Sequence, residues 1–263
     1  MKLTPNILDL QLQLQKARQP YVLATVVEIV GSSSAKPAAK ALIDQDGKLL
    51  TGWVGGGCAQ AMITETALAC LDSNEPKVVE VDLDDEIFGA GMPCGGHMRV
   101  YVEPVIPKPQ LWLMGNGRII ETLCDFAETL GFEVIIDDPQ AKDENFPWAS
   151  RIITDDQHYQ KLLPDRGDFV VIATHHKGDY ESLTQALQSE ACYIALVASR
   201  KRSDLVLKRL AEAGLSEISL TRIRAPAGLA LGAKLPEEIA LSIASEMIML
   251  KRGGDGRPLS NSE

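Results

Sequence analysis

A run of three glycines and a cysteine, Gly55-Gly56-Gly57-Cys58, combines residue types and spacing that suit chemistry. Glycine has no side chain to pack, so such a run marks a place where the backbone turns tightly or approaches another group closely. The flanking residues predict a strand over 49–54 and a helix over 59–71, with Cys58 at the first helical position. A helix N-terminus presents unpaired N–H groups and a positive dipole end, so this turn suits an anion and favours a thiolate.

A second turn of the same make-up, Cys94-Gly95-Gly96, follows later in the chain. The structural alternative for either cysteine is a small buried hydrophobe beside a tight turn. Two such turns within one short region favour a shared functional role for Cys58 and Cys94 over that alternative.

Composition and charge exclude several classes of protein. The chain has 263 residues, 45% hydrophobic and 24% charged, which is typical of one large folded domain or two modest ones. Its net charge of −10 comes from 8 basic and 13 acidic residues up to position 107 and 18 and 23 beyond it. Neither half has the basic surface that nucleic acid requires.

Cysteine usage and hydropathy indicate the compartment. The chain has five cysteines, an odd number, and none forms a CxxC pair, so free thiols are favoured over a disulfide framework or a structural zinc site. No apolar run is long enough to cross a bilayer, and the N-terminus lacks the apolar core of a signal peptide. We therefore expect a cytoplasmic protein with no membrane partner.

The residues before position 108 predict a mixed α/β domain that presents the two glycine-rich turns. Helical spacing predicts a first helix that ends before Pro20, and Asp46-Gly47 predicts a hairpin between two apolar runs. Strands are predicted over 21–29, 40–43, 49–54, 78–81 and 97–103. The stiff segment Pro107-Lys108-Pro109 marks the boundary, giving a first domain over 1–107.

From position 108 strands and helices alternate, which predicts a Rossmann-like parallel sheet over 108–252 and a disordered tail over 253–263. The first unit carries the incomplete fingerprint Gly115-Asn116-Gly117, because Ile120 occupies the place of the third glycine. The second strand, predicted over 133–136, ends in the acidic residue Asp137, as in dinucleotide-binding sheets.

Further candidates follow later strands of this sheet. His175, with its neighbour His176, is a metal ligand or a base in one interpretation and a surface or capping histidine in the other. Arg200, Lys201 and Arg202 are suited to grip a phosphate, or they form a solvated helix N-terminus. Basic residues at that helix end oppose the helix dipole, which makes an anionic ligand more attractive.

These segments together resemble the XdhC/CoxI family, the accessory proteins of molybdenum hydroxylases. The resemblance covers about residues 21 to 250 and depends on Gly55-Gly56-Gly57-Cys58, Gly91-Met92-Pro93-Cys94-Gly95-Gly96, Gly115-Asn116-Gly117, Ala198-Ser199-Arg200-Lys201-Arg202, Arg224-Ala225-Pro226-Ala227-Gly228-Leu229 and Leu235-Pro236-Glu237-Glu238-Ile239-Ala240. It implies an XdhC/CoxI-type N-terminal domain with a Rossmann domain after it.

The resemblance also implies a function. It points to a chaperone, not an enzyme in the turnover sense, that binds the molybdenum cofactor (molybdopterin) and inserts it into an apo-hydroxylase such as xanthine dehydrogenase. A cysteine desulfurase as a second partner and a homodimer belong to the same expectation. The residues expected to contact the cofactor are Gly55, Gly56, Gly57, Cys58, Cys94, Gly95, Gly96, Gly115, Gly117, Asp137, His175 and Arg200.

Cys58 and Cys94 are the candidate ligands of molybdenum or carriers of sulfur, since a thiolate is a soft ligand. We expect both on one rim facing the carboxyl edge of the Rossmann sheet. The chain departs from the family pattern at Ile120, at Arg224, where histidine is usual, and at Ala230, where aspartate is usual.

Two other functions remain open. The first is an NAD(P)-dependent oxidoreductase with a reactive cysteine. Ile120 and the lack of a Tyr-x-x-x-Lys pair after it count against that function. The second is a scaffold that only docks a hydroxylase and carries no pterin.

Overall fold

Backbone contacts divide the chain into two units, Met1–Pro107 and Lys108–Glu263. The computed structural model describes residues 6–31, 33–82, 96–174 and 178–261, with only the backbone of Cys58. Both units mix helices and strands, and the second is built on a parallel sheet, so the predicted fold class is confirmed. Four candidate residues of the sequence analysis, Cys94, Gly95, His175 and His176, lie outside the described ranges.

The first unit is a five-stranded antiparallel sheet in the order β3-β2-β1-β5-β4. Its elements are α1 (Ile7–Lys16), β1 (Tyr21–Gly31), β2 (Lys40–Asp44), β3 (Leu49–Gly52), α2 (Gly57–Ser73), β4 (Lys77–Asp82) and β5 (Gly96–Val105). Side chains alternate between the two faces of a strand. Val22, Ala24 and Val26 of β1 therefore share one face, where they are buried against α2.

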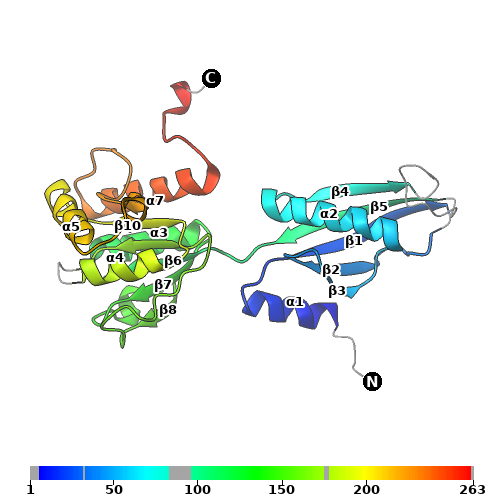
Figure 1. Ribbon diagram of the computed structural model, residues 1–263, viewed down its shortest axis with the longest axis horizontal. Coiled ribbons are helices and arrows are strands. Elements are labelled where there is room, and N and C mark those ends of the chain that lie inside the picture. The colour runs from blue at the N-terminus through cyan, green and yellow to red at the C-terminus, as the bar shows by residue number, and fades with distance from the viewer. Residues whose placement is uncertain (1–5, 32, 83–95, 175–177, 262–263) are drawn as a thin grey trace. The chain divides into compact units, whose positions relative to one another are not determined.

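Helix α2 covers that face because its own apolar positions recur at helical spacing. Ala59, Ile63, Ala67 and Cys70 are all buried in one cluster with the strands, and Figure 1 shows α2 lying along the sheet. Helix α1 supplies Leu14 to a smaller cluster with Tyr21 and Leu42. The sheet is thus closed by one long helix on the face that holds its main core.

The second unit is a six-stranded sheet in the order β11-β10-β9-β6-β7-β8, parallel throughout. Its strands are β6 (Gln110–Met114), β7 (Glu133–Asp137), β8 (Ala149–Ile153), β9 (Phe169–Ile172), β10 (Tyr193–Leu196) and β11 (Ile223–Arg224). Its α-helices are α3 (Arg118–Thr129), α4 (Asp179–Gln188), α5 (Arg200–Glu212), α6 (Glu217–Thr221) and α7 (Pro236–Arg252). This is the strand order of dinucleotide-binding Rossmann sheets.

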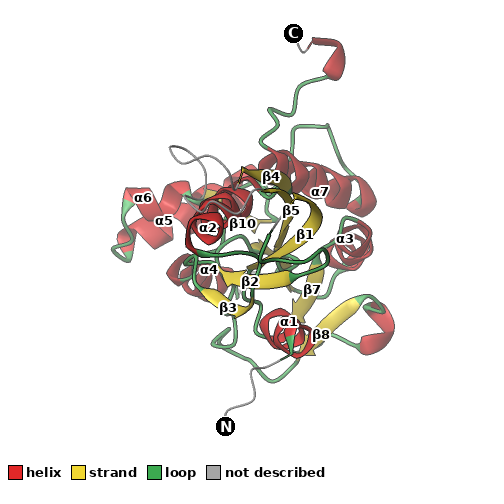
Figure 2. Cartoon of the chain, turned by 90° about the vertical axis from the view of Figure 1, so that its right-hand side faces the viewer, coloured by secondary structure: helices red, strands yellow, loops and turns green. Residues whose placement is uncertain are grey.

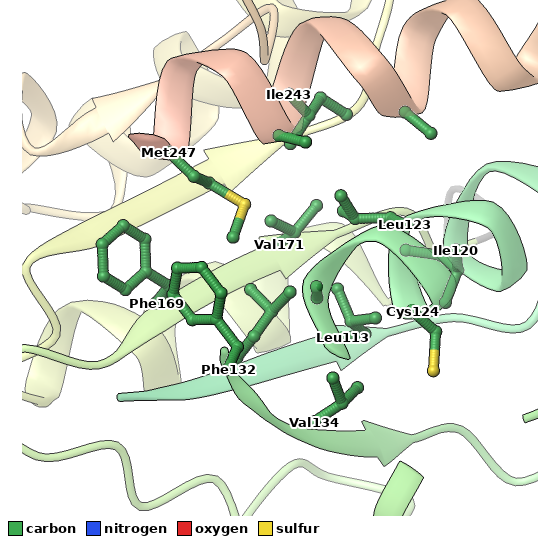
Figure 3. Close-up of a cluster of buried hydrophobic side chains, with 14 of the residues drawn as sticks. Leu113, Ile120, Leu123, Cys124, Phe132, Val134, Phe169, Val171, Ile243 and Met247 are labelled. Carbon is green, nitrogen blue, oxygen red and sulfur yellow. The ribbon is translucent and has the colours of Figure 1, made fainter. Parts of the chain in front are cut away.

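Helices cover both faces of this sheet, so its strands are apolar on both sides. Leu113 and Val171 face α3 and α7, which lie side by side in Figures 1 and 2. Figure 3 shows Ile243 and Met247 of α7 pointing into that cluster. Residues of the opposite parity, such as Trp112, pack with α4 and α5 on the other face.

Some local expectations need correction. Helix α2 begins at Gly57, so Cys58 is the second helical residue rather than the first. Ile223–Arg224 pairs with β10 as an edge strand that the sequence analysis did not predict. Two residues give too short an apolar run to be recognised from pattern alone. Beyond α7, residues 253–260 are exposed, and a short 3-10 helix, η2 (Leu259–Asn261), follows there.

Candidate functional site

The glycine turn of the first unit leads into a helix N-terminus without a side-chain cap. Gly56 is the N-cap of α2 and makes no side-chain hydrogen bond, and the first turn of α2 holds no acidic residue. Among the described residues, no atom beyond the turn and the backbone of α2 would lie within 4 Å of a Cβ at Gly57. The first N–H groups and the positive dipole end of α2 have no side-chain cap, which is a local condition that suits an anion.

The topology brings other segments to the same end of the first sheet. Gly31 at the end of β1 pairs with Gly96 at the start of β5, and Asp82 at the end of β4 pairs with His97. Strand β3 ends earlier, since Gly52 pairs with Ala41, which in turn pairs with Ala24 of β1. The residues that flank the segment 83–95, Asp82 and Gly96, therefore lie at the end of the sheet where β1 ends.

The three cysteines with described side chains have the properties of structural thiols. Cys70 and Cys124 are buried and Cys192 is exposed. Burial raises the pKa of Cys124 to about 12 and also raises the pKa of Cys70. The residue Cys192 is exposed, but its sulfur is partly buried 3.3 Å from the carbonyl oxygen of Asp168, and this desolvation raises its pKa to about 11. All three therefore stay protonated near neutral pH and are poor nucleophiles and poor soft ligands.

The turn after β6 places a second helix N-terminus at the carboxyl edge of the Rossmann sheet. Gly115 has a φ of +130°, and a Cβ there would lie 2.6 Å from the carbonyl oxygen of Ala173, so only glycine fits. Gly117 is the N-cap of α3, makes no side-chain bond and has no atom within 4 Å of its Cβ position. Strands β6 and β9 meet here, where the strand order reverses and such sheets bind ligands.

Ile120 takes the place of the third fingerprint glycine and is a core residue. Its side chain is fully buried in the cluster between α3, α7 and the sheet. The third glycine of a dinucleotide fingerprint permits close packing of helix on strand. Here an isoleucine occupies that space, while the two glycines that shape the turn itself are retained.

Asp137 is the last residue of β7, at the carboxyl edge of the sheet. It is 0% exposed, and neither carboxylate oxygen has a hydrogen-bond partner among the described residues. Burial raises its pKa to about 7, and the nearby carboxylates Asp156 and Asp138 add to the shift. Asp138 completes the acidic end of this strand, and its Oδ1 accepts the N–H of Gln140 at 2.8 Å.

A cavity of ≈ 720 Å³ lies at the carboxyl ends of β10 and β11. It is lined by residues of the β10–α5 junction, by most of the loop 226–233, and by Ile239 and Ser242 of α7. Ser199 is the N-cap of α5, and its hydroxyl accepts the N–H of Arg202. Arg200 is exposed and lines the cavity at the first position of that helix.

The three basic residues in the first turn of α5, Arg200, Lys201 and Arg202, do not bind phosphate as one group. Arg202 donates to the buried carboxylate of Asp179, and its guanidinium also donates to the carbonyl oxygen of Thr174 at 3.0 Å. The hydroxyl of Thr174 donates to Asp179 at 2.6 Å. Arg202 is therefore held within the protein, which leaves Arg200 as the guanidinium of this group that is exposed at the cavity.

Two absences hold for the described residues. Within 6–31, 33–82, 96–174 and 178–261 no three His, Cys, Asp or Glu residues are close enough to hold a metal ion. Over the same ranges, no helix has the length and apolar character needed to span a membrane.

The fold and site define a class: a two-domain α/β protein in which a sheet with a glycine-rich turn precedes a Rossmann domain. Comparison with family models gives the family. The model described as the XdhC Rossmann domain matches residues 111–247, and the model of the XdhC and CoxI family matches residues 14–82. The chain belongs to the XdhC and CoxI family.

Several relatives are similar over most of the chain. YqeB of Escherichia coli K12, an uncharacterized protein, is 28% identical over 95% of this chain, which spans about half (47%) of its length. A Bacillus subtilis 168 protein named as a probable xanthine dehydrogenase subunit is 24% identical, over 89% of this chain and 94% of its own. The molybdenum cofactor insertion chaperone PaoD of E. coli K12 is 23% identical, over 88% and 83%.

A solved structure agrees over both units. The crystal structure of a xanthine dehydrogenase from Bacillus halodurans is 26% identical and covers 97% of each chain with a TM-score of 0.50. The likeness extends over the whole chain rather than over the Rossmann domain alone.

Proposed function

We propose that this protein binds the molybdenum cofactor, shelters it and inserts it into an apo-molybdenum hydroxylase of the xanthine dehydrogenase type. The names of two relatives, a cofactor insertion chaperone and a probable component of xanthine dehydrogenase, support this role. A cysteine desulfurase as sulfur donor and a homodimeric assembly are parts of the same proposal.

The cavity at the carboxyl edge of the Rossmann sheet is the observation that carries the proposal. At ≈ 720 Å³ it lies within the range of small-molecule and cofactor sites, which is about 300–1,000 Å³. The cofactor is a pterin with an anionic phosphate. Arg200 and the N-terminus of α5 supply positive charge on one wall, and the loop 226–233 supplies small and apolar surface on another.

The glycine turns are proposed to hold the metal end of the cargo. Gly55, Gly56 and Gly57 precede Cys58 in the first turn of α2, where the helix dipole favours a thiolate. Cys58 and Cys94 are proposed as soft ligands of molybdenum or as carriers of its sulfur. The described cysteines, with raised pKa values, are unsuited to that task.

We propose that the backbone contacts the cargo at glycines. These are Gly115 and Gly117 of the Rossmann unit and Gly55, Gly56, Gly57, Gly95 and Gly96 of the two glycine-cysteine turns. The turn at Gly117 is open and lacks a side-chain cap, as an anion site requires. Asp137 and His175 are also proposed to contact the cargo.

Anaerobic co-expression with the cofactor pathway tests this function. The purified protein is assayed for bound molybdenum and pterin, and then for reactivation of an apo-hydroxylase. We expect both components with the wild-type protein, loss of transfer with Cys58→Ala and Cys94→Ala, and retention with the matched control Cys192→Ala. Arg200→Ala should weaken binding roughly tenfold through loss of a charge-assisted contact, whereas Lys201→Ala should not.

A wild-type protein free of molybdenum and pterin would reject the chaperone and favour a docking scaffold. Titration with NADH and NADPH separates the oxidoreductase from the chaperone. Submicromolar binding of either nucleotide would favour the oxidoreductase.

A further inference from the structure

The carboxylate of Glu246, on the inner face of α7, joins three segments of the Rossmann unit. The side chain is buried, with the residue 6% exposed. Its Oε2 accepts the hydroxyl of Tyr193 at 2.6 Å and the backbone N–H of Gly228 at 2.8 Å. Its Oε1 lies 4.0 Å from a guanidinium nitrogen of Arg224. A buried carboxylate with these partners is stabilised as an acceptor, because donors and a positive charge surround it.

The Tyr193 side of this contact is rigid. Tyr193 belongs to β10, its ring packs 5.6 Å from that of Phe169, and it is buried in the core cluster. Burial and the hydrogen bond to Glu246 raise the pKa of Tyr193, so its hydroxyl keeps the proton that it donates. Glu246 is thereby fixed to the sheet through a group that does not move.

Gly228, the second partner of Glu246, belongs to the loop 226–233, which forms one wall of the cavity. Gly228 has a φ of +96°, and a Cβ there would lie 2.3 Å from the hydroxyl oxygen of Ser242, so the loop runs directly against α7. Two further hydrogen bonds hold the neighbours of Gly228: the N–H of Ala227 donates to the carbonyl oxygen of Leu196 at 3.0 Å, and the N–H of Leu229 donates to the carbonyl oxygen of Ser242 at 3.2 Å. Glu246 binds the glycine between these two residues.

We propose that Glu246 is the positioning residue of the cavity, tying the loop 226–233 to the sheet so that its wall has a defined shape before the cargo arrives. This inference rests on the proposed function. Glu246 itself is absent from the lining, whereas Gly228 and Ser242, which it fixes or adjoins, are part of it. A wall that is ordered in advance reduces the conformational entropy lost on binding. Arg224 contributes by balancing the buried charge.

Two substitutions at Glu246 test whether this residue holds the loop 226–233 in place or only stabilises the fold. We call the link from Glu246 to the loop the tether. Glu246→Gln keeps an oxygen that accepts both hydrogen bonds, whereas Glu246→Ala removes both. The matched control is Ser245→Ala, the adjacent half-buried residue on α7. Amide hydrogen exchange is measured in the full-length, cofactor-free protein, and bound molybdenum and pterin are measured after anaerobic co-expression.

We expect Glu246→Ala to raise exchange at amides 227–233 roughly tenfold or more, with the amides of β6 and β9 unchanged. It should lower the cofactor content by a similar factor, while Glu246→Gln and Ser245→Ala stay close to the wild type. A Glu246→Ala protein that keeps the wild-type cofactor content would overturn the proposal. So would a uniform rise in exchange over the whole unit, because Glu246 would then serve folding alone.

The exchange measurement needs no cofactor and therefore tests the tether by itself. A wild-type protein without cofactor, combined with a loop loosened by Glu246→Ala, would count against the chaperone function and leave the tether standing. A loop unchanged by Glu246→Ala would remove the tether whatever the cargo.

Discussion

Asp137 places a carboxylate at a position of β7 that apolar side chains surround. It continues the alternation of β7 on the face that carries Ile135, where the neighbouring side chains form a hydrophobic cluster. Arg151 and Lys161 lower its pKa, but burial and the carboxylates around it outweigh them and leave the pKa at about 7. The folded protein therefore retains this proton near neutral pH, whereas an unfolded chain loses it near pH 4.

This shift makes stability depend on pH. A raised pKa in the folded state stabilises the fold fully below the unfolded pKa, and that contribution is lost as pH rises to about 7. We expect Asp137→Asn to remove this dependence. The free energy of unfolding of the variant relative to the wild type should rise by ~4 kcal/mol between about pH 4 and about pH 8. Urea unfolding followed by circular dichroism at both pH values measures it.

The exposed residue Asp125 provides the control, and Asp125→Asn should leave the pH dependence of the wild type intact. Equal stability differences for Asp137→Asn at both pH values would show that Asp137 is ionised throughout.

At the scale of elements, the buried pair between Asp179 and Arg202 ties α4 and α5 to the end of β9. Asp179 is 1% exposed at the start of α4, Arg202 lies in the first turn of α5, and Thr174 follows β9. All of their mutual bonds lie within this corner of the sheet edge. The corner adjoins the cavity, because Arg202 is also part of its lining.

Breaking this pair from one side should be costly. Arg202→Ala leaves the buried carboxylate of Asp179 without its counter-charge, so we expect a loss of about 3–5 kcal/mol in the free energy of unfolding. Arg200→Ala, two positions earlier on the same helix and exposed, should change stability by less than about 0.5 kcal/mol. Chemical denaturation of both variants measures these changes in the free energy of unfolding. If Arg202→Ala lowers it as little as Arg200→Ala does, water replaces the guanidinium beside Asp179.

At the scale of the whole molecule, each unit has its own sheet and its own core. The antiparallel sheet buries one set of apolar residues against α2, and the Rossmann sheet buries two sets against four of its helices. A domain that contains a complete core is able to fold alone.

We therefore expect residues 1–107 and 108–263 to fold when they are produced separately. Each should show a cooperative thermal transition and native-like circular dichroism. A non-cooperative transition in either fragment would contradict this expectation.

Periodicity alone determined much of this protein. The alternation of strands and helices after position 108 predicted the parallel sheet, because each strand buried on both faces must be apolar throughout. The Gly115-Asn116-Gly117 turn was foreseen because its conformation is a local property of glycine. The motifs identified the family for the same reason, since they are short runs of adjacent residues.

Only the tertiary structure decided which side chains meet. Arg200 and Arg202 belong to one basic run and both line the cavity, yet Arg200 is exposed there while Arg202 is held by Asp179, 23 positions earlier. Glu246 looks like any acidic residue of a helix until its contacts with Tyr193 and Gly228 are seen. Sequence patterns report periodicity along one element, whereas burial and pairing depend on which elements the fold brings together.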